Sequence, residues 1–64
     1  MERWSTKNGD NIENKKIDAF IEEVIAVSKK HGFSISHEDG HGAFEIEKFS
    51  ESNTSWLRHA HDAT

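Results

Sequence analysis

The chain has 64 residues, no cysteine, and a formal net charge of −4 at pH 7 with its histidines neutral. The lack of cysteine excludes disulfides and thiolate metal sites, the acidic balance argues against a nucleic-acid polymer as partner, and no apolar run reaches the roughly 20 residues that span a membrane. A chain this short buries only roughly 60% of its unfolded surface, so we expect a single small domain that gains stability as a homo-oligomer.

The first nine residues differ in character from the rest. Residues 1–9 are polar, contain Asn8-Gly9 and show neither helical nor strand periodicity, which predicts a mobile N-terminal arm. Residues 10–64 are predicted to form the single domain. Trp4 is the exception within the arm, because a tryptophan either docks on a partner or folds back onto the core of its own domain. We favour the second alternative.

A long amphipathic helix is predicted next. Its start is a capping box, in which Asp10 accepts from the backbone N–H of Glu13. Its end is marked by three consecutive basic residues, followed by Gly32 in the left-handed C′ position, with Phe33 packing back near Val27.

The apolar residues of this helix recur at helical spacing over an arc of roughly 160°, which is wider than the roughly 100° that one packing surface needs. They are Ile17, Phe20, Ile21, Val24, Ile25 and Val27, together with Ser28. One side can cover the rest of the domain. The other side is open to a second copy of the chain or to another protein, unless Trp4 and Trp56 of the same chain cover it.

A β-hairpin follows, because residues 33–37 and 44–47 alternate between apolar and polar side chains. Asp39-Gly40 favours a two-residue type I′ turn, which would set Ile35 opposite Phe44. A four-residue loop over 39–42 is the alternative; it keeps the same faces but sets Phe33 against Lys48.

Beyond Phe49, the segment Ser50-Glu51-Ser52-Asn53 offers several helix caps and predicts a short C-terminal helix. Trp56, Leu57 and Ala60 are expected to hold this helix on the core, and residues 62–64 are expected to fray. The predicted fold is therefore a small α+β domain with the order α-β-β-α.

The hairpin tip carries the residues with the most chemistry. His37, Asp39 and His41 could form a metal site, although solvated turn residues are the simpler interpretation. The chain has no nucleophile elbow, no phosphate-binding glycine loop and no carboxylate pair that so small a fold could enclose. We therefore expect no enzymatic activity and no cofactor.

Binding is the more specific hypothesis for the tip. Glycines flank His41, so backbone N–H groups near Gly42 are expected to be open to a phosphate, a carboxylate or a partner's backbone. Arg58 and the histidines would add positive charge, which suits a small anionic ligand such as a nucleotide better than a polymer. The candidate ligand-binding residues are His37, Asp39, His41, Gly42, Trp56 and Arg58.

The segment Ser34-Ile35-Ser36-His37-Glu38-Asp39-Gly40-His41-Gly42-Ala43-Phe44, followed by Trp56-Leu57, resembles a group of small bacteriophage accessory proteins. The shared features are S-x-S-H-E-D-x-H-G-A-F and a W-L near the C-terminus, and they cover roughly the last half of the chain. The resemblance implies a setting, the cytoplasm of an infected host bacterium, and carries no established activity over to these residues.

Small phage proteins often bind and block a host component. Applying this to the present chain is an analogy at the level of class. It leads us to expect a non-catalytic binding protein that counters antiviral defence, either by sequestering a nucleotide signal or by occluding a host protein. A metal-binding module and a structural phage component are the alternatives.

Overall fold

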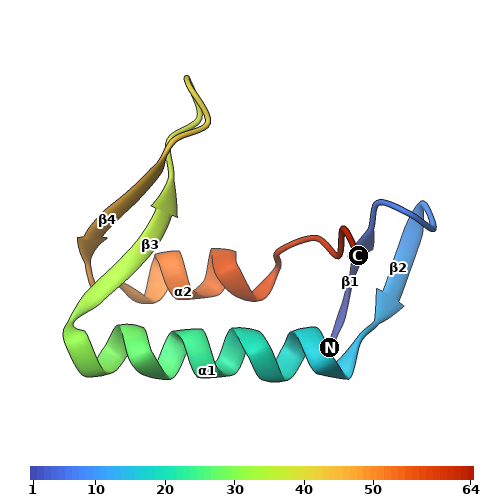
Figure 1. Cartoon of the computed structure of the whole chain (residues 1–64), viewed down its shortest axis with the longest axis horizontal. Helices are drawn as coiled ribbons and strands as arrows, with labels where there is room; N and C mark the ends of the chain where they lie inside the picture. Colours follow the sequence, from blue (N-terminus) through green and yellow to red (C-terminus); the bar gives the residue numbers. More distant parts are fainter.

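Two helices and two β-hairpins make up the fold, which is a small α+β domain (Figure 1). The computed structural model describes all of residues 1–64. Neither helix is long and apolar enough to cross a membrane. In chain order the elements are β1 (Glu2–Ser5), β2 (Asp10–Glu13), α1 (Lys15–His31), β3 (Phe33–His37), β4 (Phe44–Lys48) and α2 (Glu51–Arg58).

An N-terminal hairpin precedes the predicted order α-β-β-α, and residues 2–5, which we expected to lie in a mobile arm, form its first strand. Strands β1 and β2 pair antiparallel, with Ser5 opposite Asp10. Asp10 therefore lies in a strand and the predicted capping box is wrong. The N-cap is Asn14, whose side-chain oxygen accepts from the backbone N–H groups of Lys16 at 3.1 Å and Ile17 at 3.3 Å. Pairing with β1 holds residues 10–13 in a strand, so the helix begins after them.

The end of α1 is confirmed. Gly32 has φ 77°, and its N–H donates to the carbonyl of Ser28 at 2.9 Å.

The apolar arc of α1 is partly buried and partly exposed to solvent. Ile21 and Ile25 are buried, whereas Phe20 is 65% and Val27 57% exposed. The arc is thus wider than the surface this single chain provides to cover it.

The C-terminal tail is anchored on β1, so the predicted fraying of residues 62–64 is wrong. The N–H of Asp62 donates to the carbonyl of Trp4 at 2.7 Å, and the N–H of Thr6 donates to the carbonyl of Asp62 at 2.9 Å. Asp62 is only 3% exposed. Figure 1 shows the tail running back to lie beside β1. No local pattern marks such a bridge, because its two sides are far apart in the sequence.

Two carboxylates in this region make the fold acid-sensitive. Hydrogen bonding by the Arg3 guanidinium holds the pKa of Asp18 below its ordinary value, and hydrogen bonds from the hydroxyl and N–H of Thr64 do the same for the pKa of Asp62. A pKa that is lower in the folded than in the unfolded state stabilises the fold above the unfolded pKa, near pH 4, and this contribution is lost as the pH falls.

Asp18→Asn should therefore melt below the wild type at pH 7, and the difference should shrink as the pH falls from about 5 toward 2. Melting curves followed by circular dichroism across this range measure it. A difference that stays constant with pH would contradict the assignment of Asp18 as a stabilising carboxylate.

The hairpin β3–β4 has the predicted faces but not the favoured turn. Phe33 pairs with Lys48, and Ile35 with Ile46, which is the register of the four-residue loop. The N–H of Glu38 donates to the carbonyl of Ala43 at 2.7 Å and closes the loop over residues 39–42. The predicted two-residue turn at Asp39-Gly40 is therefore wrong.

The loop needs a glycine at position 42 rather than at position 40. Gly42 has φ 71°, while Gly40 has no positive φ. A non-glycine residue in the left-handed region costs about 1–2 kcal/mol, so Gly42→Ala should lower the melting temperature by several degrees. A Cβ at Gly40 would meet only the flexible carboxylate of Glu38. Gly40→Ala should therefore cost less, and a larger fall for Gly40→Ala in thermal melts would show that the loop is formed differently.

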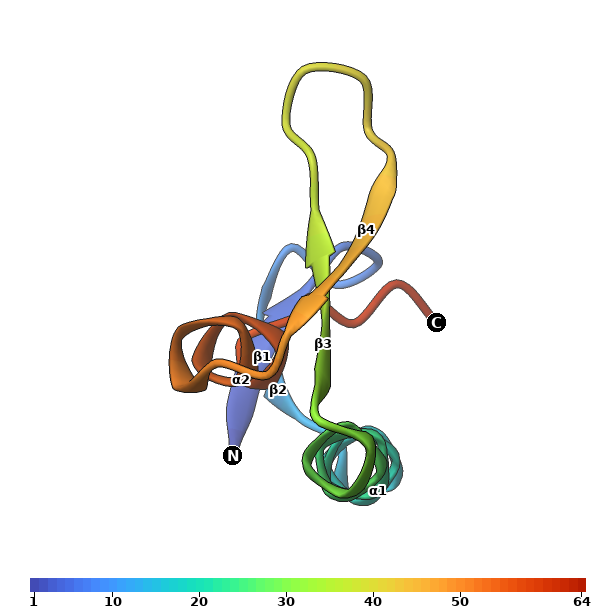
Figure 2. The same cartoon turned by 90° about the vertical axis from the view of Figure 1, so that its left-hand side faces the viewer.

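Helix α2 attaches to the hairpin through polar groups rather than through its large apolar residue. The N–H of its N-cap, Ser50, donates to the hydroxyl of buried Ser34 at 2.9 Å. Thr54 is the buried residue of α2, whereas Trp56 is 79% exposed. The prediction that Trp56 holds α2 on the core is therefore wrong. Figure 2, which looks along α1, shows the hairpin standing clear of both helices above its base.

Candidate functional site

A groove lies between one side of the hairpin and α2, and it brings together three of the six predicted binding residues. His37 and Asp39 line it from the hairpin, and Trp56 lines it from α2. We call it the acidic groove, because three carboxylates lie along it and His37 is its only basic side chain. The carboxylates belong to Asp39, Glu45 and Glu47.

Two aromatic side chains are exposed in this groove. Phe44 comes from β4 and Trp56 from α2, and each is 79% exposed. Phe44 also meets the imidazole of His37 edge to face, with ring centroids 6.0 Å apart and an interplanar angle of 80°. Exposed aromatic residues of this size are typical of surfaces that bind other molecules.

Hydrogen bonds hold the wall of the groove in place. The side-chain amide of Asn53 donates to the Glu47 carboxylate at 3.0 Å, and the N-cap hydroxyl of Ser50 accepts from the N–H of Asn53 at 3.1 Å. Hydrogen bonding from Ser36, followed by that from Asn53, keeps the pKa of Glu47 below its ordinary value. Glu47 is therefore a fixed negative charge at neutral pH.

The hairpin tip uses its own backbone donors. The Glu38 carboxylate accepts from the N–H of Gly40 at 2.6 Å and from the N–H of His41 at 2.7 Å. The N–H of Gly42 donates to the carbonyl of Glu38 at 3.0 Å. Hydrogen bonding to the carboxylate from the His41 N–H, followed by that from the Gly40 N–H, lowers the pKa of Glu38. The N–H groups that we expected to be open to an anion are thus occupied by Glu38.

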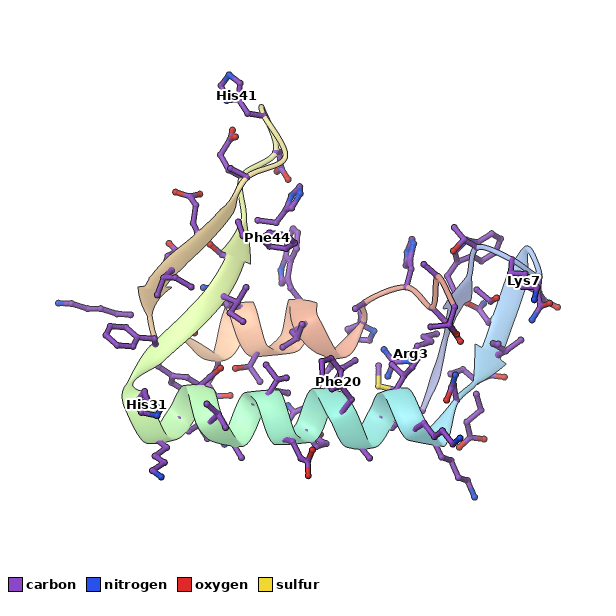
Figure 3. The ribbon with its side chains drawn as sticks, in the orientation of Figure 1. Arg3, Lys7, Phe20, His31, His41 and Phe44 are labelled. Atoms are coloured by element: carbon purple, nitrogen blue, oxygen red, sulfur yellow. The ribbon has the colours of Figure 1, made fainter.

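The remaining two predicted side chains lie away from the acidic groove. His41 stands at the extreme tip of the hairpin (Figure 3), with its Nδ1 3.2 Å from the Glu38 carboxylate. Arg58 lies at the end of α2, where its Nε and Nη2 donate to the two carboxylate oxygens of Glu22 on α1, at 3.1 and 3.3 Å. This pairing raises the pKa of Arg58. Arg58 joins the two helices and adds no charge to the groove.

The histidines and carboxylates of the tip form two separate pairs. His37 Nδ1 lies 3.4 Å from Asp39 Oδ1, and His41 pairs with Glu38. No group of three or more His, Cys, Asp or Glu side chains in the chain is arranged to hold a metal ion. The geometry gives no support to a metal site built from His37, Asp39 and His41.

Sequence reasoning missed the contribution of β4 to this groove. Phe44 was assigned to the core because it alternates with glutamates, and the favoured turn placed it opposite Ile35. In the observed register it lies opposite His37 instead. The four-residue loop was the signal that would have placed Phe44 beside His37 and Glu45 beside Ser36.

Comparison with known proteins gives no match: no family model, no curated protein and no solved structure is similar to this chain.

Proposed function

We propose that this chain is a non-catalytic phage accessory protein that counters host defence by occluding a host protein, which it holds through a basic segment in the acidic groove. The observation that carries the proposal is the pair of highly exposed aromatic side chains, Phe44 and Trp56, set among three carboxylates. Aromatic residues dominate the binding energy of protein interfaces, and charge complementarity selects the partner.

The geometry supports binding over catalysis. The titratable groups of the tip are paired with their neighbours in the chain, and the side chains of Asp39 and His41 are 92% and 91% exposed. Catalytic acids, bases and oxyanion donors work in sites from which water is excluded. An open groove with solvent-exposed side chains can bind a partner but does not exclude water.

The charge distribution favours a protein partner over a nucleotide signal. An anionic nucleotide would meet the carboxylates of Asp39, Glu45 and Glu47, and His37 would be the only group able to attract it. Arg58, which we expected to bind phosphate, is engaged by Glu22. The same carboxylates would attract the lysine and arginine side chains of a peptide, and these side chains can also stack on the face of Trp56.

The phage setting is supported by the resemblance of residues 34–44 and Trp56-Leu57 to small phage accessory proteins. Such proteins act by binding and blocking, which is an analogy at the level of class. It agrees with a chain of 64 residues whose exposed features are suited to recognition.

Isothermal titration calorimetry with defined ligands tests the proposal. A short peptide rich in arginine and lysine should release or absorb heat and saturate, with affinity that falls as salt screens the charges. An acidic peptide and cyclic dinucleotides should give no heat. Trp56→Ala should weaken peptide binding by roughly tenfold or more, as expected for an interface hot spot. Trp4→Phe, a change in β1 away from the groove, is the matched control and should bind like the wild type.

Each contrary outcome favours a named alternative. Heat with cyclic dinucleotides and none with the basic peptide would replace the proposal by sequestration of a nucleotide signal. A thermal shift with zinc that His37→Ala abolishes would indicate a metal-binding module. Incorporation of the chain into phage particles, with no binding to either probe, would indicate a structural component.

A further inference from the structure

A second groove lies between the hairpin and α1; it shares Ile35 with the acidic groove and is almost free of charge. It is formed by α1 and the hairpin, and no residue of α2 contributes to it. Its only carboxylate belongs to Glu23, its only titratable base is His31, and it has no lysine or arginine. We call it the apolar groove; its hydrophobic residues are Phe20, Val24, Val27, Phe33, Ile35 and Ile46.

The chain exposes more surface than a folded monomer of its mass should. Its accessible surface is 5023 Å² for 7.3 kDa, whereas the scaling for monomeric proteins gives roughly 4,200 Å². The excess of roughly 800 Å² equals the area that each partner contributes to a standard protein interface. Only two hydrophobic residues of the chain, Ile21 and Ile25, are buried.

We infer that the apolar groove is covered by a second copy of this chain, in a symmetric dimer. A core with only two buried isoleucines is small, so covering this groove should add substantially to the stability of the chain. A second copy is present wherever the chain is made and is therefore the occupant that can always supply this stability. The inference does not depend on the proposed function.

The distribution of charge assigns the two grooves to different partners. Two chains that each carry −4 repel one another, so copies should meet where charge is lowest, and that is the apolar groove. In a two-fold contact each residue meets the partner's equivalent surface. The acidic groove would set like charges against one another in such a contact, which makes it unsuitable for self-association and leaves it free for a basic partner.

The hairpin gives the contact its shape. It rises from the end of α1 with a two-stranded sheet that no third strand flanks (Figures 1 and 2). Ile46 is 66% exposed on β4, and Val27 is more than half exposed on α1. The hairpin of one copy, laid against α1 of its partner, would cover both residues and leave Trp56 in water.

Sedimentation velocity and native mass spectrometry of the full chain test the inference. The wild type should have twice the 7.3 kDa mass of the chain. Ile46→Lys, and separately Val27→Glu, should reduce the mass to that of the monomer. Trp56→Ala removes a side chain that is more exposed than either of these and lies outside the apolar groove, so it should leave the dimer intact.

Thermal melting of the wild type supplies a readout that needs no variant. The melting temperature of a dimer rises with protein concentration, so it should increase by several degrees over a roughly hundredfold range of concentration. A monomeric mass together with a concentration-independent melting temperature would overturn the inference. A complex of one copy of the chain with one bacterial protein would also overturn the inference. A dimer that persists in both Ile46→Lys and Val27→Glu would do the same.

Discussion

Replacing Arg3 with methionine should lower the melting temperature by roughly 10 °C or more. Arg3 is 4% exposed and joins three parts of the fold. Its guanidinium donates to the Asp18 carboxylate on α1, to the carbonyl of Arg58 at 3.1 Å and to the carbonyl of Ala60 at 2.9 Å. Figure 3 shows its side chain between α1 and the C-terminal tail.

The size of this effect follows from the number of groups that lose a donor. Hydrogen bonds from a charged donor contribute about 1.5–3 kcal/mol each, and 1 kcal/mol shifts the melting temperature of a domain this size by about 4–8 °C. Methionine fills a similar volume but leaves Asp18 and the carbonyls after α2 without Arg3. Lys7→Met, in the exposed turn between β1 and β2, is the control and should melt near the wild type. Equal losses for both variants would show that Arg3 does not join these segments.

Ile25→Ala should destabilise the chain by about 2–5 kcal/mol. Ile25 is the most buried hydrophobic residue, at 3% exposure, and truncation leaves a cavity that so small a core cannot close. A domain of this length is stabilised by roughly 3–10 kcal/mol in total. Urea denaturation should therefore show a midpoint far below that of the wild type, or a chain already unfolded in water.

Lys16→Ala is the matched control for Ile25→Ala, because both residues lie on α1 and Lys16 is exposed and lines neither groove. The control removes a side chain from water rather than from the core and should leave the urea midpoint close to that of the wild type. A shift as large as that of Ile25→Ala would mean that the buried face of α1 has been assigned incorrectly.

Local patterns predicted the parts of the fold that local physics decides. The end of α1 at Gly32 follows from its left-handed φ, and the alternating faces of the hairpin follow from the two-residue period of a strand. The start of α1 could not be read in this way, since Asp10 and Asn14 are both good caps. Pairing of β2 with β1 places Asp10 in a strand and leaves Asn14 as the cap. In the same way, the hydrogen bonds of Asp62 to β1 prevent the tail from fraying.

The site was predictable only in part, for a related physical reason. His37, Asp39 and Trp56 do lie along one groove, but the sequence pattern assigns Phe44 to the core and Trp56 both to the core and to the binding residues. Apolar alternation indicates that a face is buried, without indicating which molecule buries it. In this chain much of the apolar surface of α1 and the hairpin is exposed. The sequence presents Arg58 as a free cation because its partner, Glu22, is 36 residues away.

The most direct test of the binding account is nuclear magnetic resonance of the two tryptophan indole N–H groups during titration with an arginine- and lysine-rich peptide. Trp56 lies in the acidic groove and Trp4 lies in β1, so each molecule carries its own control. We expect the Trp56 resonance to shift and saturate while the Trp4 resonance stays in place. Equal shifts of both indoles, or a shift of Trp4 alone, would contradict recognition of a basic segment by the acidic groove.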